Sequence, residues 1–221
     1  MINAVLFDLD GTLLDTAPDL LAALNHVRHS EGLDGLSEEG FRHHVSRGAG
    51  GMILAGMPAS DSGQFELRKQ LFLDHYRDHL YVKTRPFDGV IELLAALDAR
   101  AVPWGVVTNK TENLTHPLLR AAGLFSRAAC VVCGDTVEQS KPHPAPVLLG
   151  CEILKIAPVN TLLVGDDLRD LEAGQAAGTQ IALAAYGYIA PDIDVRPYAG
   201  SHRINHPKDV LDVVRQAGVS G

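Results

Sequence analysis

Two aspartates, Asp8 and Asp10, stand at the end of an apolar run that begins at Ala4. Because side chains alternate along a β-strand, residues two apart can point both carboxylates toward the same opening beyond the strand. Neighbouring carboxylates repel each other unless a cation neutralises them or one stays protonated. The pair therefore indicates a metal site, acid/base chemistry, or both.

A second acidic group follows another short apolar run, in the segment Gly165-Asp166-Asp167-Leu168-Arg169-Asp170. If this strand lies beside the first, three or four carboxylates meet at one edge of a sheet. A ligand set made only of oxygen atoms suits Mg²⁺. We therefore predict a Mg²⁺ site at this edge.

Thr108 and Lys141 complete a set that is typical of phosphoryl transfer. Thr108 ends a strand-like run and offers a hydroxyl group to an anion, and Lys141 supplies a compact positive charge. With a metal and a lysine offsetting the phosphoryl charge, Asp8 can attack the phosphorus as a nucleophile. Asp10 then protonates the leaving alcohol and later activates the water that hydrolyses the aspartyl phosphate.

Each of these features also has a simpler structural explanation. An Asp-x-Asp pair is often a solvated loop, threonine favours strands, a lysine before proline is usually on the surface, and aspartates favour helix N-termini. Four such features in order, each at a predicted strand end or in the loop after it, favour the catalytic interpretation.

Short β-rich runs alternate with helical patterns along most of the chain. This alternation predicts an α/β fold with a doubly wound parallel sheet covered by helices on both faces, and a site beyond the carboxyl ends of its strands. The expected strands are 4–10, 104–108, 129–133, 161–165 and 180–184, and the expected helices are 90–100, 113–122, 144–154 and 168–177.

The interval from Thr16 to Thr84 contains no strand-like run and predicts an inserted all-helical domain. We expect residues 1–15 and 85–221 to form the catalytic core and residues 16–84 to form a cap over it. Within the cap we expect helices at 18–31, 37–45 and 62–80 and a glycine-rich turn at 48–51. The tail from 186 to 206 is expected to be a loop before a last helix at 207–216.

Composition excludes several classes of function. The chain has 221 residues with 46% hydrophobic content, and its 19 basic and 27 acidic side chains give a net charge of −8, which argues against nucleic-acid binding. No apolar stretch approaches the ~18 residues that a membrane span needs, and no signal peptide is evident, so we expect a cytoplasmic protein. The three cysteines, Cys130, Cys133 and Cys151, are expected in the core and not at a metal.

The motifs Asp8-Leu9-Asp10-Gly11-Thr12, Val106-Val107-Thr108-Asn109, Lys141 and Gly165 to Asp170 together resemble the haloacid dehalogenase superfamily. The resemblance implies a Rossmann-like core with Asp8 as nucleophile and Asp10 as acid/base. It implies Mg²⁺ bound by the Asp8 side chain, the Asp10 main-chain carbonyl and Asp166. Thr108 and Asn109 would contact the phosphoryl group, Lys141 would orient it, and Asp167 and Asp170 would act through water or through the ligands.

The helical insertion resembles the cap of the phosphoglycolate phosphatase group, which would close over the site and exclude water. Gly48, Gly50 and Gly51 resemble a substrate-facing cap loop, with Arg47 placed to contact a second substrate anion. The runs 104–110, 165–170 and 186–189 resemble the branch that dephosphorylates N-acetylmuramic acid 6-phosphate. We expect a phosphatase of a small phosphorylated metabolite, either that sugar acid or 2-phosphoglycolate.

Three alternatives stay open from the sequence. A β-phosphoglucomutase-like enzyme would use the same motifs and return the phosphoryl group to a sugar. A phosphoaspartate signalling domain gathers similar residues, although its acidic pair precedes the phosphorylated strand and it has no large cap. A catalytically idle binding protein with this fold is the third alternative. The oligomeric state is open.

Overall fold

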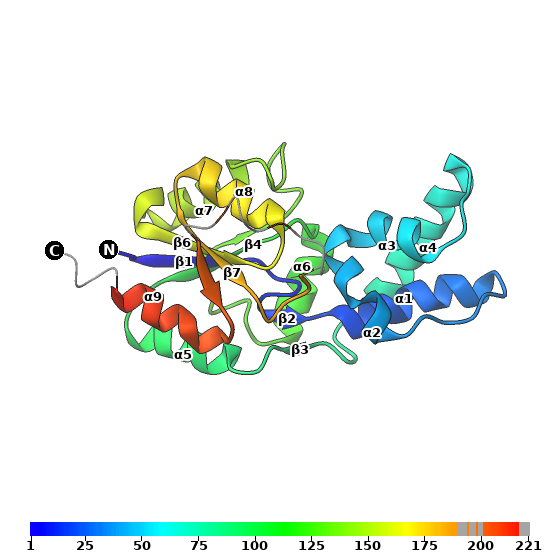
Figure 1. Cartoon of the computed structure of the whole chain (residues 1–221), viewed down its shortest axis with the longest axis horizontal. Coiled ribbons are helices and arrows are strands. Elements are labelled where there is room, and N and C mark those ends of the chain that lie inside the picture. Colours follow the sequence, from blue (N-terminus) through cyan, green and yellow to red (C-terminus); the bar gives the residue numbers. More distant parts are fainter. Residues whose placement is uncertain (190–193, 195–197, 199–200, 217–221) are drawn as a thin grey trace.

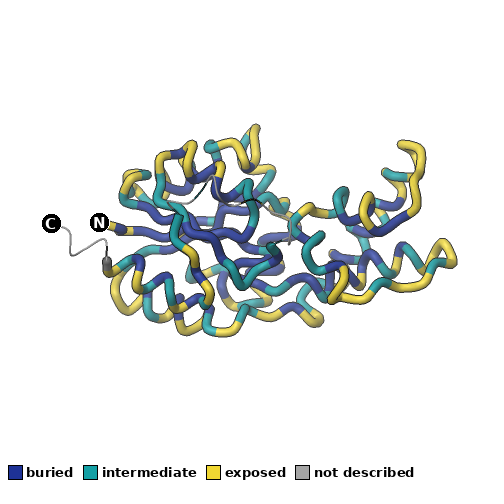
Figure 2. Tube along the Cα trace, viewed as in Figure 1, coloured by how far each residue is buried: buried dark blue, intermediate teal, exposed yellow. Residues whose placement is uncertain are grey.

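The computed structural model describes residues 1–189, 194, 198 and 201–216. An α/β lobe, in which the N-terminus lies, carries a helical lobe at its opposite end (Figure 1). A tube coloured by burial shows the strands as the buried centre of the α/β lobe, with exposed positions on the outer faces of the helices (Figure 2).

The α/β lobe is built on a six-stranded sheet in the order β5-β4-β1-β6-β7-β8. Every neighbouring pair in it runs parallel. The strands are β1 (Ala4–Phe7), β4 (Trp104–Val107), β5 (Val131–Val132), β6 (Thr161–Gly165), β7 (Gln180–Ala184) and β8 (His202–Ile204).

Helices cover both faces of this sheet, as the wholly apolar and buried central strands β1 and β4 require. Val5 and Phe7 of β1 pack on one face with α5 (Val90–Ala99), α6 (Glu112–Ala121) and α9 (Val210–Gln216). Leu6 points to the other face, toward α7 (Ala145–Leu154) and α8 (Leu168–Ala177). The expected doubly wound α/β class is confirmed.

The helical lobe is inserted between β2 (Leu14–Asp15) and β3 (Arg85–Pro86), which pair antiparallel at its base. Its helices are α1 (Ala17–Ser30), α2 (Glu38–Phe41), the 3₁₀ helix η1 (Arg42–Arg47), α3 (Gly48–Gly56) and α4 (Ser62–Asp78). The predicted helix at 37–45 is thus α2 followed by a 3₁₀ segment. The division at residues 16 and 84 stays a prediction.

The prediction of a glycine-rich turn at 48–51 is wrong, because these residues begin helix α3. Only Gly48 has a turn-like conformation, with φ of 67°. Glycine is a poor helix former, but Met52 and Ile53 bury their side chains in the core of the helical lobe. At Gly56 an added Cβ would lie 2.6 Å from Leu24 Cδ2, so a larger residue there would force Leu24 to shift where α3 packs on α1. Tertiary packing overrides local propensity in this segment.

Polar contacts fix both chain crossings at the base of the insertion. Asp19 of α1 is 4% exposed and accepts hydrogen bonds from the main-chain N–H groups of Lys83 and Thr84 and from the Thr84 hydroxyl. The Tyr188 hydroxyl of the α/β lobe donates to Asp15 and accepts from the Ala17 N–H. Both crossings between the lobes are therefore tied by buried hydrogen bonds.

Other departures from the expected elements are small. The strand expected at 129–133 is reduced to β5, and the tail expected to be a loop contains β8, although residues 190–193, 195–197 and 199–200 of that tail lie outside the described residues. Cys130, Cys133 and Cys151 are free and buried, as expected. Among the described residues, no helix has the length and apolar character that crossing a bilayer demands.

Candidate active site

Strand β1 lies at the centre of the sheet, with β4 on one side and β6 on the other. The strand order reverses here, and ligand sites of open parallel sheets form beyond the carboxyl ends of strands at such a point. Asp8 follows β1, Thr108 follows β4 and Asp166 follows β6. The topology thus brings together three residues that are distant in sequence.

Asp8 and Asp170 share one buried lysine. Lys141, in the loop between β5 and α7, places its Nζ 2.8 Å from Asp8 Oδ1 and 2.6 Å from Asp170 Oδ1, and donates to the Val107 carbonyl at 2.6 Å. Burial raises the pKa of Asp8 to about 7 against the opposing effect of Lys141. Burial alone would lower the pKa of Lys141, but its two carboxylate partners raise it, so the lysine stays charged.

Asp166 receives only neutral donors. Its carboxylate accepts from the Thr12 hydroxyl at 3.0 Å and the Tyr188 N–H at 2.9 Å, and no salt bridge joins it to a basic side chain within the described ranges. Burial, followed by the charge of Asp8, raises the pKa of Asp166 well above its usual range. The negative charge at this position is not offset by the protein.

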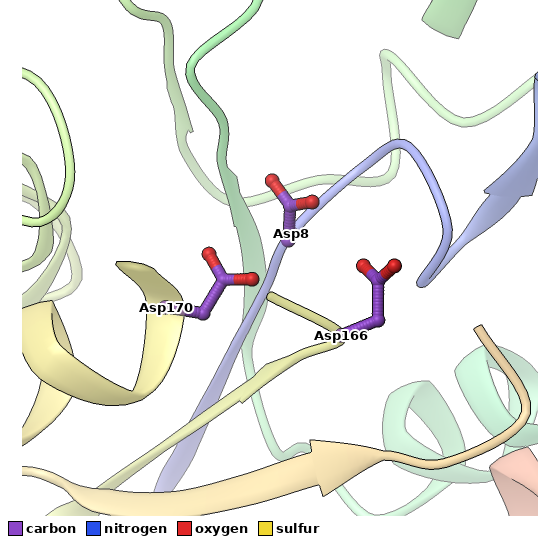
Figure 3. A group of neighbouring side chains, drawn as sticks. All are labelled: Asp8, Asp166 and Asp170. Atoms are coloured by element: carbon purple, nitrogen blue, oxygen red, sulfur yellow. The ribbon is translucent and has the colours of Figure 1, made fainter. Parts of the chain in front are cut away.

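A divalent cation would offset the excess negative charge of the three carboxylates. Carboxylate oxygens of Asp8, Asp166 and Asp170 lie within 4.8 Å of one another, and Figure 3 shows all three carboxyl groups at the same end of the strands. Three carboxylates face one lysine, and hard oxygen donors suit Mg²⁺. Gly11, with φ of 87°, lets the chain pass close to Asp166, because a Cβ there would lie 2.2 Å from its Oδ2.

Asp167 and Asp170 hold the start of helix α8. The Asp167 side chain accepts from the Arg169 N–H at 2.9 Å, and Asp170 Oδ2 accepts from the Asp167 N–H at 3.1 Å, which together form a capping box. Asp170 therefore has two roles, since it caps helix α8 and also fixes Lys141. Asp167 pairs with Arg169, and these contacts lower its pKa against the effect of burial.

Thr108 and Asn109 follow β4 at the edge of the same site. Thr108 is 2% exposed, and its Oγ1 accepts the Lys110 N–H at 3.2 Å, which leaves its own hydroxyl hydrogen to donate to a ligand. The Asn109 amide makes two hydrogen bonds with the main chain of Lys141, at 2.8 and 3.0 Å. Asn109 thus fixes the loop that carries the lysine, a contact that the sequence did not predict.

The Asp10 side chain is engaged by two residues outside the three-carboxylate cluster. Its Oδ1 accepts from the Thr16 hydroxyl at 2.6 Å, and its Oδ2 lies 3.2 Å from Lys110 Nζ. The main-chain carbonyl is then the group of Asp10 that stays available to a metal, in keeping with the expected ligand set.

A cavity of about 450 Å³ lies between the strand ends and the helical lobe. Asp8, Asp10, Thr108 and Lys141 line its floor. The helical lobe supplies the roof, including two basic side chains, Arg47 and Lys69. Apolar side chains complete the wall: Leu20, Val45, Phe72, Leu73, Tyr76 and Leu114.

All nine predicted site residues thus lie in or beside one cavity: Asp8, Asp10, Arg47, Thr108, Asn109, Lys141, Asp167 and Asp170 line it, and Asp166 adjoins Asp8. The sequence motifs indicated no role for Lys110, Tyr76 or Tyr188. Lys110 directly follows the Thr108-Asn109 pair, and this position was a signal that could have identified it. Tyr76 comes from the insertion, where no motif indicated it.

Comparison with known proteins identifies the family of this chain. Residues 5–184 match the family model of the haloacid dehalogenase-like hydrolases. The chain is 44% identical over 217 residues to the N-acetylmuramic acid 6-phosphate phosphatase of Pseudomonas aeruginosa, covering 98% of this chain and 96% of that protein. It is 40% identical to the phosphoglycolate phosphatase of Xylella fastidiosa, over 84% of this chain and 81% of that protein.

The fold has close counterparts among solved structures. A crystal structure described as a predicted phosphoglycolate phosphatase of Haemophilus somnus superposes with a TM-score of 0.85 at 27% identity, covering 96% of this chain and 97% of the other. The expected family and the expected class of phosphoric monoester hydrolase are confirmed. The sequence motifs, the sheet topology and these relatives place the chain in the haloacid dehalogenase-like hydrolase family.

Proposed function

We propose that this protein is a Mg²⁺-dependent phosphatase that hydrolyses a small phosphomonoester through a phosphoaspartate at Asp8. The observation that carries the proposal is the meeting of Asp8, Lys141 and Thr108 on the floor of one cavity closed by the helical lobe. A nucleophilic carboxylate, a fixed cation and a hydroxyl donor are the groups that phosphoryl transfer to an aspartate requires.

In the first step, a carboxylate oxygen of Asp8 attacks phosphorus while the bond between phosphorus and the ester oxygen breaks. Asp10 gives a proton to the departing alcohol oxygen. Lys141 holds Asp8 from its Oδ1 side, so the other oxygen is the one that attacks. Thr108 donates its hydroxyl hydrogen to a phosphoryl oxygen.

In the second step, Asp10, now a carboxylate, takes a proton from water, and the water oxygen attacks the phosphorus. The bond between Asp8 and phosphorus breaks, releasing inorganic phosphate and restoring both aspartates. When bound by Asp8, Asp166 and the Asp10 carbonyl, Mg²⁺ supplies positive charge that offsets repulsion between Asp8 and the phosphoryl group. The helical lobe excludes bulk water from these steps.

N-acetylmuramic acid 6-phosphate is the substrate we favour, and 2-phosphoglycolate is the second candidate. The relative with that sugar-acid activity matches nearly the full chain at 44% identity. The cavity of about 450 Å³ lies in the range of roughly 300–1,000 Å³ that holds ligands much larger than phosphoglycolate. Both substrates carry a carboxylate besides the phosphate.

Arg47 is the side chain we assign to that carboxylate. It lines the cavity roof and makes no ion pair with any residue that the structure describes. A guanidinium group binds a carboxylate through two parallel hydrogen bonds, which suits recognition of a second anion. Selection among phosphate esters would then come from the cap and not from the catalytic floor.

The test is phosphate release from a panel that contains N-acetylmuramic acid 6-phosphate, 2-phosphoglycolate and β-glucose 1-phosphate, with Mg²⁺ or with EDTA. Turnover that needs Mg²⁺ and disappears in Asp8→Asn supports the mechanism, and the preferred ester identifies the substrate. Release of phosphate without a bisphosphate cofactor excludes the mutase alternative. Absence of turnover on every ester would overturn the proposal. A cytoplasmic location stays a prediction.

A further inference from the structure

Lys110 forms a buried bridge between the two lobes that the mechanism above does not use. The side chain is 8% exposed and leaves the α/β lobe just beyond Thr108. Its Nζ lies 3.2 Å from Asp10 Oδ2, and it also donates to the hydroxyl of Tyr76 at 3.2 Å. Tyr76 belongs to helix α4 of the helical lobe and is 1% exposed.

The ammonium group is held firmly in this place. It lies 4.6 Å from the centre of the Tyr76 ring, so the tyrosine stabilises it through its ring as well as through its hydroxyl. The Lys110 main-chain carbonyl accepts from the Gly134 N–H at 2.9 Å and from the Thr115 hydroxyl at 3.2 Å. A buried lysine with one carboxylate partner and a fixed main chain has little freedom to move elsewhere.

Asp10 gains a defined orientation from this lysine. Both of its carboxylate oxygens are engaged, Oδ1 by Thr16 and Oδ2 by Lys110. Thr16 precedes helix α1 at the base of the helical lobe, and Lys110 is held by Tyr76 from that lobe's helix α4. The acid/base of the α/β lobe is therefore oriented by contacts that depend on the seated cap.

We propose that Lys110, supported by Tyr76, is a positioning residue that aims Asp10 at the leaving oxygen of the substrate when the helical lobe is closed. This inference rests on the proposed phosphatase function and goes beyond it, because it assigns to the cap a part in acid/base catalysis. A positioned acid matters most when the leaving group is strongly basic, since such a group needs a proton to depart.

Two aryl esters without a second anion test the inference. Phenyl phosphate has a more basic leaving group than p-nitrophenyl phosphate, and kcat/KM for each ester reports the step in which phosphorus moves to Asp8. We expect Lys110→Met to lower kcat/KM about 10- to 100-fold for phenyl phosphate and at most about threefold for p-nitrophenyl phosphate. Lys110→Arg should recover part of the difference.

Two further variants complete the experiment. Lys208→Met, at an exposed lysine of the 3₁₀ helix η4 (Pro207–Asp209), is the matched control and should leave both values unchanged. Tyr76→Phe keeps the ring and removes the hydroxyl, and should change the ratio of the two values about threefold in the same direction as Lys110→Met. If Lys110→Met does not fold, Tyr76→Phe tests the inference by itself.

Equal losses on both esters, or an unchanged ratio in Tyr76→Phe, would overturn the inference, because they would mean that Lys110 contacts the phosphoryl group or only stabilises the fold. Failure of the proposed phosphatase function would be seen in a different measurement. In that case the unaltered protein with Mg²⁺ releases no phosphate from p-nitrophenyl phosphate, whatever the variants do.

Discussion

The floor and the roof of the cavity hold their positive charges differently. On the floor, Lys141 lies between Asp8 and Asp170, and Lys110 lies against Asp10. The pair of Lys141 and Asp170 is nearly inaccessible to solvent, with side chains 2% and 3% exposed, whereas the Asp8 and Asp10 side chains are 13% and 18% exposed. The floor is an ordered charge network before any ligand arrives.

On the roof, the basic side chains have weaker partners. Lys69 lies 3.7 Å from Glu66, and these two side chains are 39% and 66% exposed. An exposed ion pair of this kind contributes little to stability. Arg47 has no ion pair among the described residues. The difference fits the proposed function, in which the floor carries out one reaction and the roof keeps charge available for the part of the substrate that varies between esters.

The largest expected effect comes from removing the nucleophile. Asp8→Asn should lower turnover of every ester by about a thousandfold or more, because an amide cannot attack phosphorus as a carboxylate does. It should leave the fold intact, since it removes one of three crowded carboxylates. Phosphate release measures the loss of turnover, and a thermal melt checks that the fold is intact. Residual turnover on one ester alone would break the comparison, because the floor would then discriminate between substrates.

Removing the shared lysine should affect both chemistry and stability. Lys141→Met leaves the carboxylates of Asp8 and Asp170 buried without their cation, which should lower the free energy of unfolding by roughly 3–5 kcal/mol. Turnover should fall about 100- to 1,000-fold. Denaturant unfolding without Mg²⁺ measures the change in the free energy of unfolding. A variant as stable as the original protein would show that the network is not the organised element described here.

The roof should respond more mildly and only for certain substrates. Arg47→Gln should raise KM about tenfold for a phosphate ester that carries a carboxylate, because one charged contact to the substrate is lost. Phenyl phosphate, which lacks a second anion, is the control, and its kcat/KM should stay within about twofold. An equal loss on both esters would place Arg47 at the phosphoryl group and erase the distinction between roof and floor.

The last expected effect concerns stability and not turnover, as a pH dependence in the metal-free protein. The folded-state pKa of Asp8 is raised from 3.8 to about 7, so the folded state retains this proton while the unfolded state releases it. Asp8 therefore destabilises the fold increasingly as pH rises from about 4 to about 7. The thermal midpoint of Asp8→Asn relative to the original protein should rise across this window and level off above it.

Mg²⁺ sharpens the same measurement. Binding to the folded state alone should raise the thermal midpoint of the original protein and reduce its difference from Asp8→Asn. Calcium-free buffers with EDTA provide the metal-free reference. A midpoint difference that does not change with pH or with Mg²⁺ would contradict the assignment of uncompensated charge to the carboxylate cluster.

Most of the catalytic floor was predictable because its residues stand at strand ends. Asp8, Thr108 and Asp166 each end an apolar run, and parallel strands bring such ends to one edge of the sheet. Lys141 was predictable from its residue type and order along the chain. The helix that begins at Gly48 was not, because the burial of Met52 and Ile53 that stabilises it depends on helices elsewhere in the sequence.

The sequence by itself determined the α/β class and the family, and it predicted most of the side chains on the cavity floor, since strand patterning and motif spacing are local properties of the chain. Only the tertiary structure decided which lysine meets which carboxylate. Tyr76 and Lys110 are 34 positions apart and belong to different lobes, so their contact exists only once the cap is seated. The orientation of Asp10, and the lack of an ion pair for Arg47 within the described part of the chain, follow from that packing, because distance and burial arise only when the lobes meet.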